Sequence, residues 1–231
     1  MRALKTPFPT PQAAGGGGIP TAGLLGEYLF ESQDGTDTSG NSRDATNTNV
    51  TYSTGKIGSY CAVLNGSNAY IELPTLSAWE DLDSVDFSCC IWVETTDSTA
   101  GQSIVGNYAT LTAGGPTPNQ FWMLYNLSSA GDTAAFLRRD NNAETALTSG
   151  TVIKDGTWHF LIFEKDGLDV SIYKDNVLID TDTLSLDGST DNNQPVRVGV
   201  NFGRFLSANI DGLRLYNRVL TSDEKTLLFN E

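Results

Sequence analysis

Apolar and polar residues alternate along most of the chain after residue 22, with the period of two that is typical of β-strands. Four side chains of the stretch 87–93 fall on one face, namely Phe87, Cys89, Ile91 and Val93. The stretch 157–163 is apolar on both faces, which predicts a strand that is covered on both sides. Many short strands, separated by turn residues and not alternating with helices, predict an all-β, antiparallel two-sheet β-sandwich or jelly roll.

A β-hairpin is predicted where two apolar stretches, 170–173 and 177–179, flank a short polar segment. Asp175 and Asn176 would form its two-residue turn, which needs the positive φ angles that Asp and Asn tolerate better than most residues. A turn at this position places Ile172 opposite Ile179. The turn and the apolar pattern therefore predict the same register.

The two ends of the chain differ from the strand-rich middle. Near the C-terminus, Thr221–Glu224 has the spacing of a capping box and precedes apolar residues, which predicts a short helix. Residues 1–22 are rich in Pro and Gly and favour neither a helix nor an interior strand. We therefore divide the chain into an extended arm, 1–22, and one domain, 23–231. The arm is either a free linker or is held by a partner subunit, for which Leu4 and Phe8 are the candidate anchors.

Six motifs in the domain, taken in order, resemble those of laminin-G-like, concanavalin A-like lectin/glucanase jelly rolls. They lie at 23–41, 62–72, 87–93, 155–160, 172–178 and 210–220. The resemblance implies two packed antiparallel sheets. This sequence departs from the family pattern at Asn176, where a Gly is usual, and at Gly212, where an acidic residue is common. The resemblance leaves the function open, because the fold is found in lectins, hydrolases, adhesins and structural modules.

The charge balance narrows the range of partners. The chain has 28 acidic and 14 basic residues among 231, which gives a net charge of −14. This balance disfavours nucleic acid and anionic membrane surfaces as partners, because both attract basic proteins. The three cysteines, Cys61, Cys89 and Cys90, are expected to be buried thiols, although a bridge from Cys61 to either of the others is open. Cys89 and Cys90 point to opposite faces of a strand and should not bridge each other.

An acidic loop at residues 34–44 is the best candidate for a metal site. Its Asp, Asn and Ser side chains and backbone carbonyls offer the oxygen ligands that Ca²⁺ prefers. The family resemblance implies a structural calcium ion, and the matching positions here are Asp37, Asn41 and Asp211. The alternative is an ordinary loop in which these side chains bond to their own backbone.

Carbohydrate binding is a second candidate chemistry, since sugars stack on aromatic rings and bond to amide groups. Trp122 and Asn119 lie at the junction of a Gly/Pro-rich loop and a strand, and Asn201 lies near another loop. The alternative for Trp122 is packing inside the sandwich, because the strand pattern places it on the face opposite to Phe121 and Met123.

The sequence argues against catalysis. A glycosidase needs two closely spaced carboxylates, and no tight Glu-x-Asp-x-Glu run is present. The one histidine, His159, sits in the middle of a predicted strand, which favours a structural role. We therefore expect a protein that is not an enzyme.

Two non-enzymatic functions follow, and a glycoside hydrolase ranks third. The first is a phage virion decoration or appendage subunit, made in the host cytoplasm and displayed on the virion surface. It would be anchored by its arm to capsid or tail subunits, with self-association and a glycan ligand left open. The second is a free, extracellular carbohydrate-binding module. We rank the virion subunit first because the chain begins without a signal peptide and its odd set of thiols suits a cytoplasmic fold.

Overall fold

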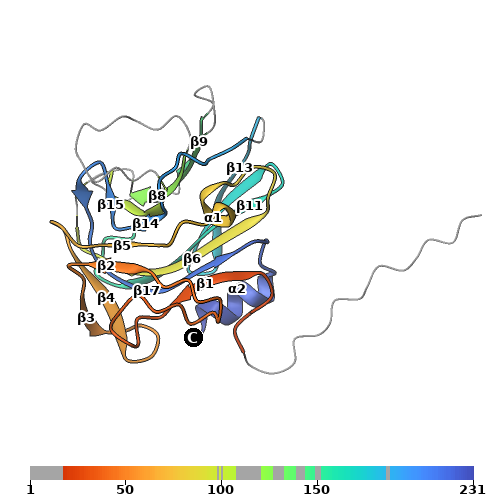
Figure 1. Ribbon diagram of the computed structural model, residues 1–231. Helices are drawn as coiled ribbons and strands as arrows, with labels where there is room; N and C mark the ends of the chain where they lie inside the picture. The colour runs from red at the N-terminus through yellow and green to blue at the C-terminus, as the bar shows by residue number, and fades with distance from the viewer. Residues whose placement is uncertain are drawn as a thin grey trace, which may run out of the picture.

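The computed structural model describes residues 18–97, 99, 101–107, 121–126, 133–138, 144–148, 152–185 and 188–231. Its strands form two large antiparallel sheets that stack as a sandwich, which confirms the predicted all-β fold (Figure 1). The first sheet has the order β13-β12-β11-β6-β17-β4-β3, with β1 also paired to β17. The second sheet has the order β10-β9-β8-β7-β14-β5-β2, and β15 and β16 form a separate hairpin.

The strands of the first sheet are β1 (Leu24–Tyr28), β3 (Thr51–Thr54), β4 (Tyr60–Asn65), β6 (Phe87–Glu94), β11 (Trp158–Asp166), β12 (Asp169–Lys174), β13 (Val177–Thr183) and β17 (Ser207–Tyr216). Those of the second are β2 (Thr46–Thr48), β5 (Tyr70–Glu72), β7 (Ser103–Gly106), β8 (Phe121–Asn126), β9 (Thr133–Arg138), β10 (Glu144–Thr148) and β14 (Arg197–Val198). The small hairpin pairs β15 (Val200–Asn201) with β16 (Arg204–Phe205). The helices are α1 (Ser77–Glu80) and α2 (Ser222–Phe229).

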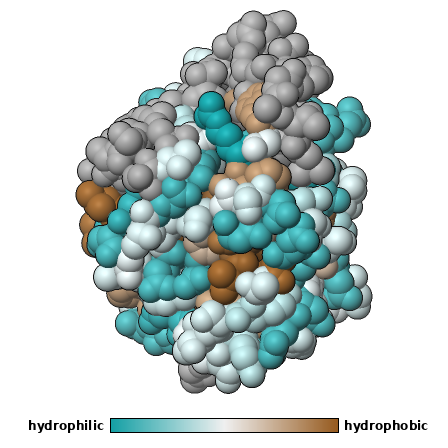
Figure 2. Space-filling model, turned by 90° about the vertical axis from the view of Figure 1, so that its left-hand side faces the viewer, coloured by the Kyte–Doolittle hydropathy of each residue, from teal (hydrophilic) through white to brown (hydrophobic). Residues whose placement is uncertain are grey.

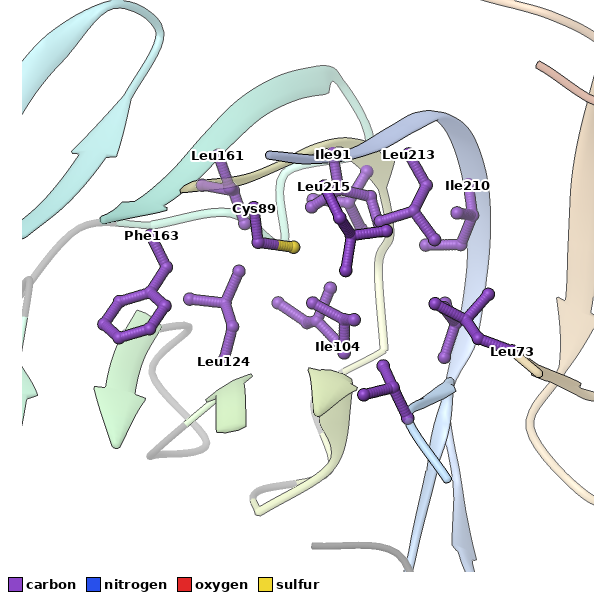
Figure 3. Packing of buried hydrophobic residues seen from close by; sticks show 14 of the residues in the cluster. Leu73, Cys89, Ile91, Ile104, Leu124, Leu161, Phe163, Ile210, Leu213 and Leu215 are labelled. Carbon is purple, nitrogen blue, oxygen red and sulfur yellow. The ribbon is translucent and has the colours of Figure 1, made fainter. Parts of the chain in front are cut away.

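The main core lies between the two sheets, where alternate side chains of each strand meet. Figure 3 shows Cys89 and Leu215 of the first sheet pointing toward Leu124 and Ile104 of the second. The four side chains predicted to share one face of β6 all belong to this core: Phe87, Cys89, Ile91 and Val93. The period of two in the sequence therefore identifies the buried face of β6 correctly.

The outer face of the first sheet is also covered. Phe160 and Ile162 of β11 belong to a second apolar cluster, to which Leu228 of α2 contributes. The helix lies against this sheet in Figure 1. Its N-terminus is the predicted capping box: Thr221 Oγ1 accepts the backbone N–H of Glu224 at 3.3 Å, and the Glu224 carboxylate accepts that of Thr221 at 2.8 Å. The prediction that β11 is covered on both sides is confirmed.

The β12–β13 hairpin has the predicted turn but a different register. Asp175 and Asn176 occupy a two-residue turn with φ angles of 51° and 63°, and the flanking residues pair directly. The next pair is Tyr173 with Leu178. A β-bulge then interrupts the ladder, so Ile172 lies opposite Asp180 rather than Ile179. The predicted pairing of Ile172 with Ile179 is wrong, because a bulge adds a residue to one strand and shifts every later pair.

The start of the described chain is fixed to the domain. Ile19 packs against the second apolar cluster, and Pro20 is buried with its carbonyl accepting the Tyr216 hydroxyl at 3.1 Å. The Ala22 carbonyl accepts Arg218 Nε at 2.7 Å. Residues 19–22 thus pack on the sandwich although the sequence groups them with the arm. The proposed anchors Leu4 and Phe8 lie outside the described residues.

All three cysteines are buried and free, which confirms the preferred interpretation. Cys89 points into the main core and Cys90 into the second cluster, on opposite faces of β6 as expected. Burial raises the pKa of the Cys61 thiol to about 11 and raises the pKa of the other two further. No helix in the described part of the chain is long and apolar enough to cross a membrane.

Candidate functional site

A cleft of about 340 Å³ opens where β4 and β6 end and β17 begins. Its lining comes from these strands and from the loops that follow β6 and precede β11: Val63, Leu64, Glu94, Thr95, Thr96, Gly156, Ser207, Ala208 and Asn209. The volume is at the lower end of the range for small-molecule sites. Figure 2 shows that hydrophilic side chains cover most of one end of the molecule, around a small hydrophobic area.

One row of paired residues forms the outer surface beside this cleft. Asn209 on β17 pairs with Val63 on one side and with Glu94 on the other, and Glu94 pairs with Trp158 on β11. Directly opposite residues of an antiparallel pair lie on the same face. Their neighbours along the strands, Val93 among them, point into the main core, so this row faces outward. An aliphatic, an amide, a carboxylate and an indole side chain therefore lie side by side.

The polar groups of the cleft are arranged by a few hydrogen bonds. Asn209 Nδ2 donates to Glu94 Oε2 at 2.7 Å, which fixes both side chains. Thr95 is buried, and its hydroxyl donates to the Ser207 carbonyl at 2.6 Å. The side chains of Thr96 and Ser207 are exposed at the rim. Carboxylate, amide and hydroxyl oxygens thus face a half-buried space.

The loop before β11 forms one wall of the cleft, and hydrogen bonds of His159 fix its position. Gly156 N donates to the Thr95 carbonyl at 3.1 Å, which joins this loop to the end of β6. The buried His159 ring lies between Asp155 Oδ1, at 3.1 Å, and Asp175 Oδ2, at 2.8 Å. Hydrogen bonds from Thr157, and a smaller effect of His159, lower the pKa of Asp155 to about 2. The rim of the cleft therefore carries a second negative charge at neutral pH.

A family model described as the concanavalin A-like lectin/glucanases superfamily, Laminin G type, matches residues 65–224, which is well over half of the chain. The chain belongs to this superfamily. No curated protein matches the sequence significantly.

Several solved structures share the fold of the concanavalin A-like domain. Domain 4 of AbnA, an extracellular arabinanase of Geobacillus stearothermophilus solved with arabinotriose, is 27% identical with a TM-score of 0.74. That match covers 90% of this chain and 98% of the other. The binding domain of Paraclostridial Mosquitocidal Protein 1 is 19% identical, with a TM-score of 0.73 and coverage of 90% and 52%.

A third structure, the binding domain of botulinum neurotoxin DC in complex with SialylT, is 14% identical with a TM-score of 0.68. The match covers 91% of this chain and 52% of that one, so the concanavalin A-like domain spans about half the length of these toxin binding domains. At these identities the toxin structures establish the shared fold.

The predicted calcium ligands of this concanavalin A-like domain bond to separate stretches of backbone. Asp37 accepts backbone N–H groups of Glu27, Ser39 and Arg43 at 2.9–3.0 Å. Burial alone would raise the pKa of Asp37, but hydrogen bonds hold it below its ordinary value. Asn41 donates its amide to the carbonyls of β1. These hydrogen bonds match the alternative to a calcium site, an ordinary loop whose side chains bond to backbone groups.

Asp211 lies on β17 and bonds elsewhere. It is fully buried, and its carboxylate accepts the backbone N–H groups of Lys56, Ile57 and Gly212 at 2.8–2.9 Å. Burial raises the pKa of Asp211 to about 6. It shares no hydrogen-bond partner with Asp37, and the described residues contain no group of three His, Cys, Asp or Glu side chains arranged to hold a metal. Calcium binding by Asp37, Asn41 and Asp211 stays a prediction.

The predicted sugar-binding residues occupy other places. Trp122 is fully buried, stacks on Phe163 at 6.2 Å and donates Nε1 to the Trp79 carbonyl at 2.7 Å, so it packs in the sandwich and presents no ring at the surface. Asn201 is buried, its Nδ2 donates to the Gly101 carbonyl at 3.1 Å, and no described residue bonds to its Oδ1. Asn119 lies outside the described residues.

Sequence reasoning missed the residues that line the cleft. Glu94 is the last residue of β6 and Asn209 lies near the start of β17, and a polar residue on the outer face near a strand end is an ordinary pattern. The sequence does show that an aromatic and an acidic residue, Trp92 and Glu94, share one face of a strand. It does not show that β6 pairs with β17, because more than a hundred residues separate the two strands.

Proposed function

We propose that this chain is a non-catalytic carbohydrate-binding module whose ligand occupies the cleft beside Glu94 and Asn209. The observation that carries the proposal is the row of side chains on the outer face of the first sheet. Glu94 and Asn209 offer oxygen acceptors, Val63 offers an aliphatic surface, and Trp158 on the next strand is a half-buried aromatic ring. Sugars need this combination, because they carry hydroxyl groups at their edges and C–H groups on their faces.

The comparisons support a binding role. The arabinanase domain was solved with arabinotriose and shares nearly its whole length with this chain, and the neurotoxin binding domain was solved with SialylT. Both are jelly rolls named with a saccharide ligand. The identity of 27% with the first favours a neutral arabino-oligosaccharide as the first ligand to test.

The lining of the cleft favours binding over hydrolysis. Both retaining and inverting glycosidases need two carboxyl groups flanking the scissile bond. Among the residues that line the cleft, Glu94 is the one carboxylate. His159, the remaining candidate proton carrier, contacts Asp155 and Asp175, and these contacts hold a loop in place.

Attachment to a virion remains a separate prediction. It depends on Leu4 and Phe8 within residues 1–17, which lie outside the described residues. A surface appendage that binds host glycans through the cleft is compatible with the proposed function. Deletion of residues 1–17 tests the arm, with loss of particle attachment expected and unaltered attachment as the opposing result.

Titration calorimetry with arabinotriose and a panel of neutral oligosaccharides tests the proposed function. Asn209→Ala should weaken binding about tenfold or more, because it removes an acceptor and releases Glu94. Asn217→Ala is the matched control, since this exposed amide follows the far end of β17. Equal loss in both variants, or binding that Asn209→Ala leaves intact, would contradict the assignment of the ligand to the cleft.

A further inference from the structure

We infer that the cleft selects neutral, hydroxyl-rich saccharides against acidic ones, and that Glu94 is the specificity-determining residue. The inference rests on the proposed function and adds the substrate class. An acidic saccharide here means one that carries a carboxylate or sulfate on the sugar ring that enters the cleft.

Glu94 and Asn209 each leave one acceptor oxygen facing the cleft. Glu94 accepts through Oε2 from Asn209 Nδ2, and its Oε1 has no partner among the described residues. Asn209 uses its amide nitrogen in that bond, which leaves its Oδ1 as an acceptor. Glu94 Oε1 and Asn209 Oδ1 therefore accept hydrogen bonds and donate none. A group bound to these two oxygens must supply hydrogens, as a sugar hydroxyl does and as an ionised carboxylate or sulfate does not.

The cleft and its rim carry negative charge. Glu94 is the one ionisable residue in the lining, and the adjoining rim carries Asp155, whose pKa of about 2 keeps it ionised at neutral pH. No described basic residue lines the cleft, and the Nζ of Lys56 lies 4.5 Å from the centre of the ring of Trp92, which shares the outer face of β6 with Glu94. Two like charges a few ångströms apart in a half-buried site repel strongly. The net charge of −14 adds a repulsive field over the whole molecule.

The site also suits a neutral ring in shape. Val63 lies beside the polar pair in the cleft lining and offers apolar surface to the C–H face of a sugar, and Trp158, which packs against the second apolar cluster, continues the same row. A neutral sugar can use both the acceptors and this surface. An acidic sugar of the same size can use the surface only by bringing its charge close to Glu94.

The experiment compares ligands of equal length that differ in charge at one position of each ring, by calorimetry at pH 7 and low salt. The pairs are galactose and galacturonate oligomers, tested at several lengths. In the wild type we expect the neutral member to bind about tenfold more tightly or better. Glu94→Gln, which keeps the shape and the acceptor for Asn209 but removes the charge, should narrow this gap at least about threefold.

Asp166→Asn is the matched control, because it removes one exposed negative charge at the opposite end of β11 and should leave the gap intact. Equal or tighter binding of the acidic member in the wild type would overturn the inference, and so would a gap that Glu94→Gln does not change. In either case the proposed function stands as long as Asn209→Ala still weakens saccharide binding. If neither these pairs nor arabinotriose binds, the proposed function fails as well.

Discussion

The buried ion pair beneath α2 gives a sharp test of how the C-terminal helix is held. Lys225 Nζ donates to Glu164 of β11, and both side chains are almost completely buried. The ammonium group also lies 3.8 Å from the centre of the Tyr173 ring. Glu164 accepts two further bonds, from Ser88 Oγ at 3.1 Å and from the backbone N–H of Leu220 at 3.2 Å. Lys225→Met keeps the apolar stem but leaves a buried carboxylate without its cation.

Removal of one partner of a buried pair typically costs about 3–5 kcal/mol, most of it for the charge left behind. The two neutral donors that remain on Glu164 offset part of that cost, so we expect Lys225→Met to lose about 3 kcal/mol of unfolding free energy. Adding Glu164→Gln removes the uncompensated charge and should restore about half of the loss. Burial favours the neutral amine, but the bonds to Glu164 and Tyr173 raise the net pKa of Lys225.

The free energies come from urea unfolding followed by tryptophan fluorescence at pH 7 and again at pH 11. Because the folded pKa of Lys225 is raised, its contribution is complete below its ordinary pKa of about 10.4 and falls as pH rises past that value. The difference between wild type and Lys225→Met should therefore shrink at pH 11. Lys174→Met, which breaks a partly exposed contact with Asp175 at 3.9 Å, is the control and should cost less than about 1 kcal/mol. A Lys225→Met protein as stable as wild type, or one that Glu164→Gln destabilises further, would refute this reasoning.

Three further predictions follow. Gly212 has a φ of 54° and a Cβ there would lie 2.6 Å from Ile57 Cδ1, so Gly212→Ala should cost about 1–3 kcal/mol in urea unfolding, and an unchanged midpoint would contradict the strain. The pKa of Asp37 is lowered in the folded protein, so the carboxylate stabilises the fold above about pH 4 and this stabilisation is lost on acidification. Asp37→Ala should therefore lose about 1–3 kcal/mol of unfolding free energy at pH 7. At about pH 2 the loss should be much smaller, and the variant and the wild type should unfold alike. If Asp37, Asn41 and Asp211 bind calcium, EDTA should lower the melting temperature and added Ca²⁺ should restore it; a melting temperature that ignores both would refute the calcium prediction.

The fold was predictable from local pattern because each strand carries its own period. In β6 and β11 the alternation identifies both the buried faces and the need for a cover, and the Thr221–Glu224 capping box identifies the helix that supplies it. The hairpin shows where pattern fails. The turn at Asp175 and Asn176 follows from local φ preferences, but the bulge beside Ile172 depends on how β12 fits against its neighbours.

The candidate site could not be predicted in the same way. Glu94 and Asn209 meet because β6 and β17 are adjacent, and nothing local to either residue records that pairing. Trp122 and Asp37 became candidate ligand contacts because of their residue types. Trp122 is a large ring near a loop, yet its indole is needed in the core, and Asp37 belongs to an acidic loop whose carboxylate is used by its own backbone. Residue type alone does not separate a ligand contact from a structural one.

The position of β17 has a consequence for how the protein is made. This strand pairs with β1, β4 and β6, and Leu24 near the start of the domain lies opposite Tyr216 near its end. Until β17 leaves the ribosome, three strands of the first sheet lack the neighbour that joins them. The domain therefore folds after its synthesis rather than during it, and the nascent chain exposes open strand edges for that interval. Loss of residues 207–231 would remove β17 from the middle of the sheet, whereas loss of residues 1–18 would leave every described strand in place.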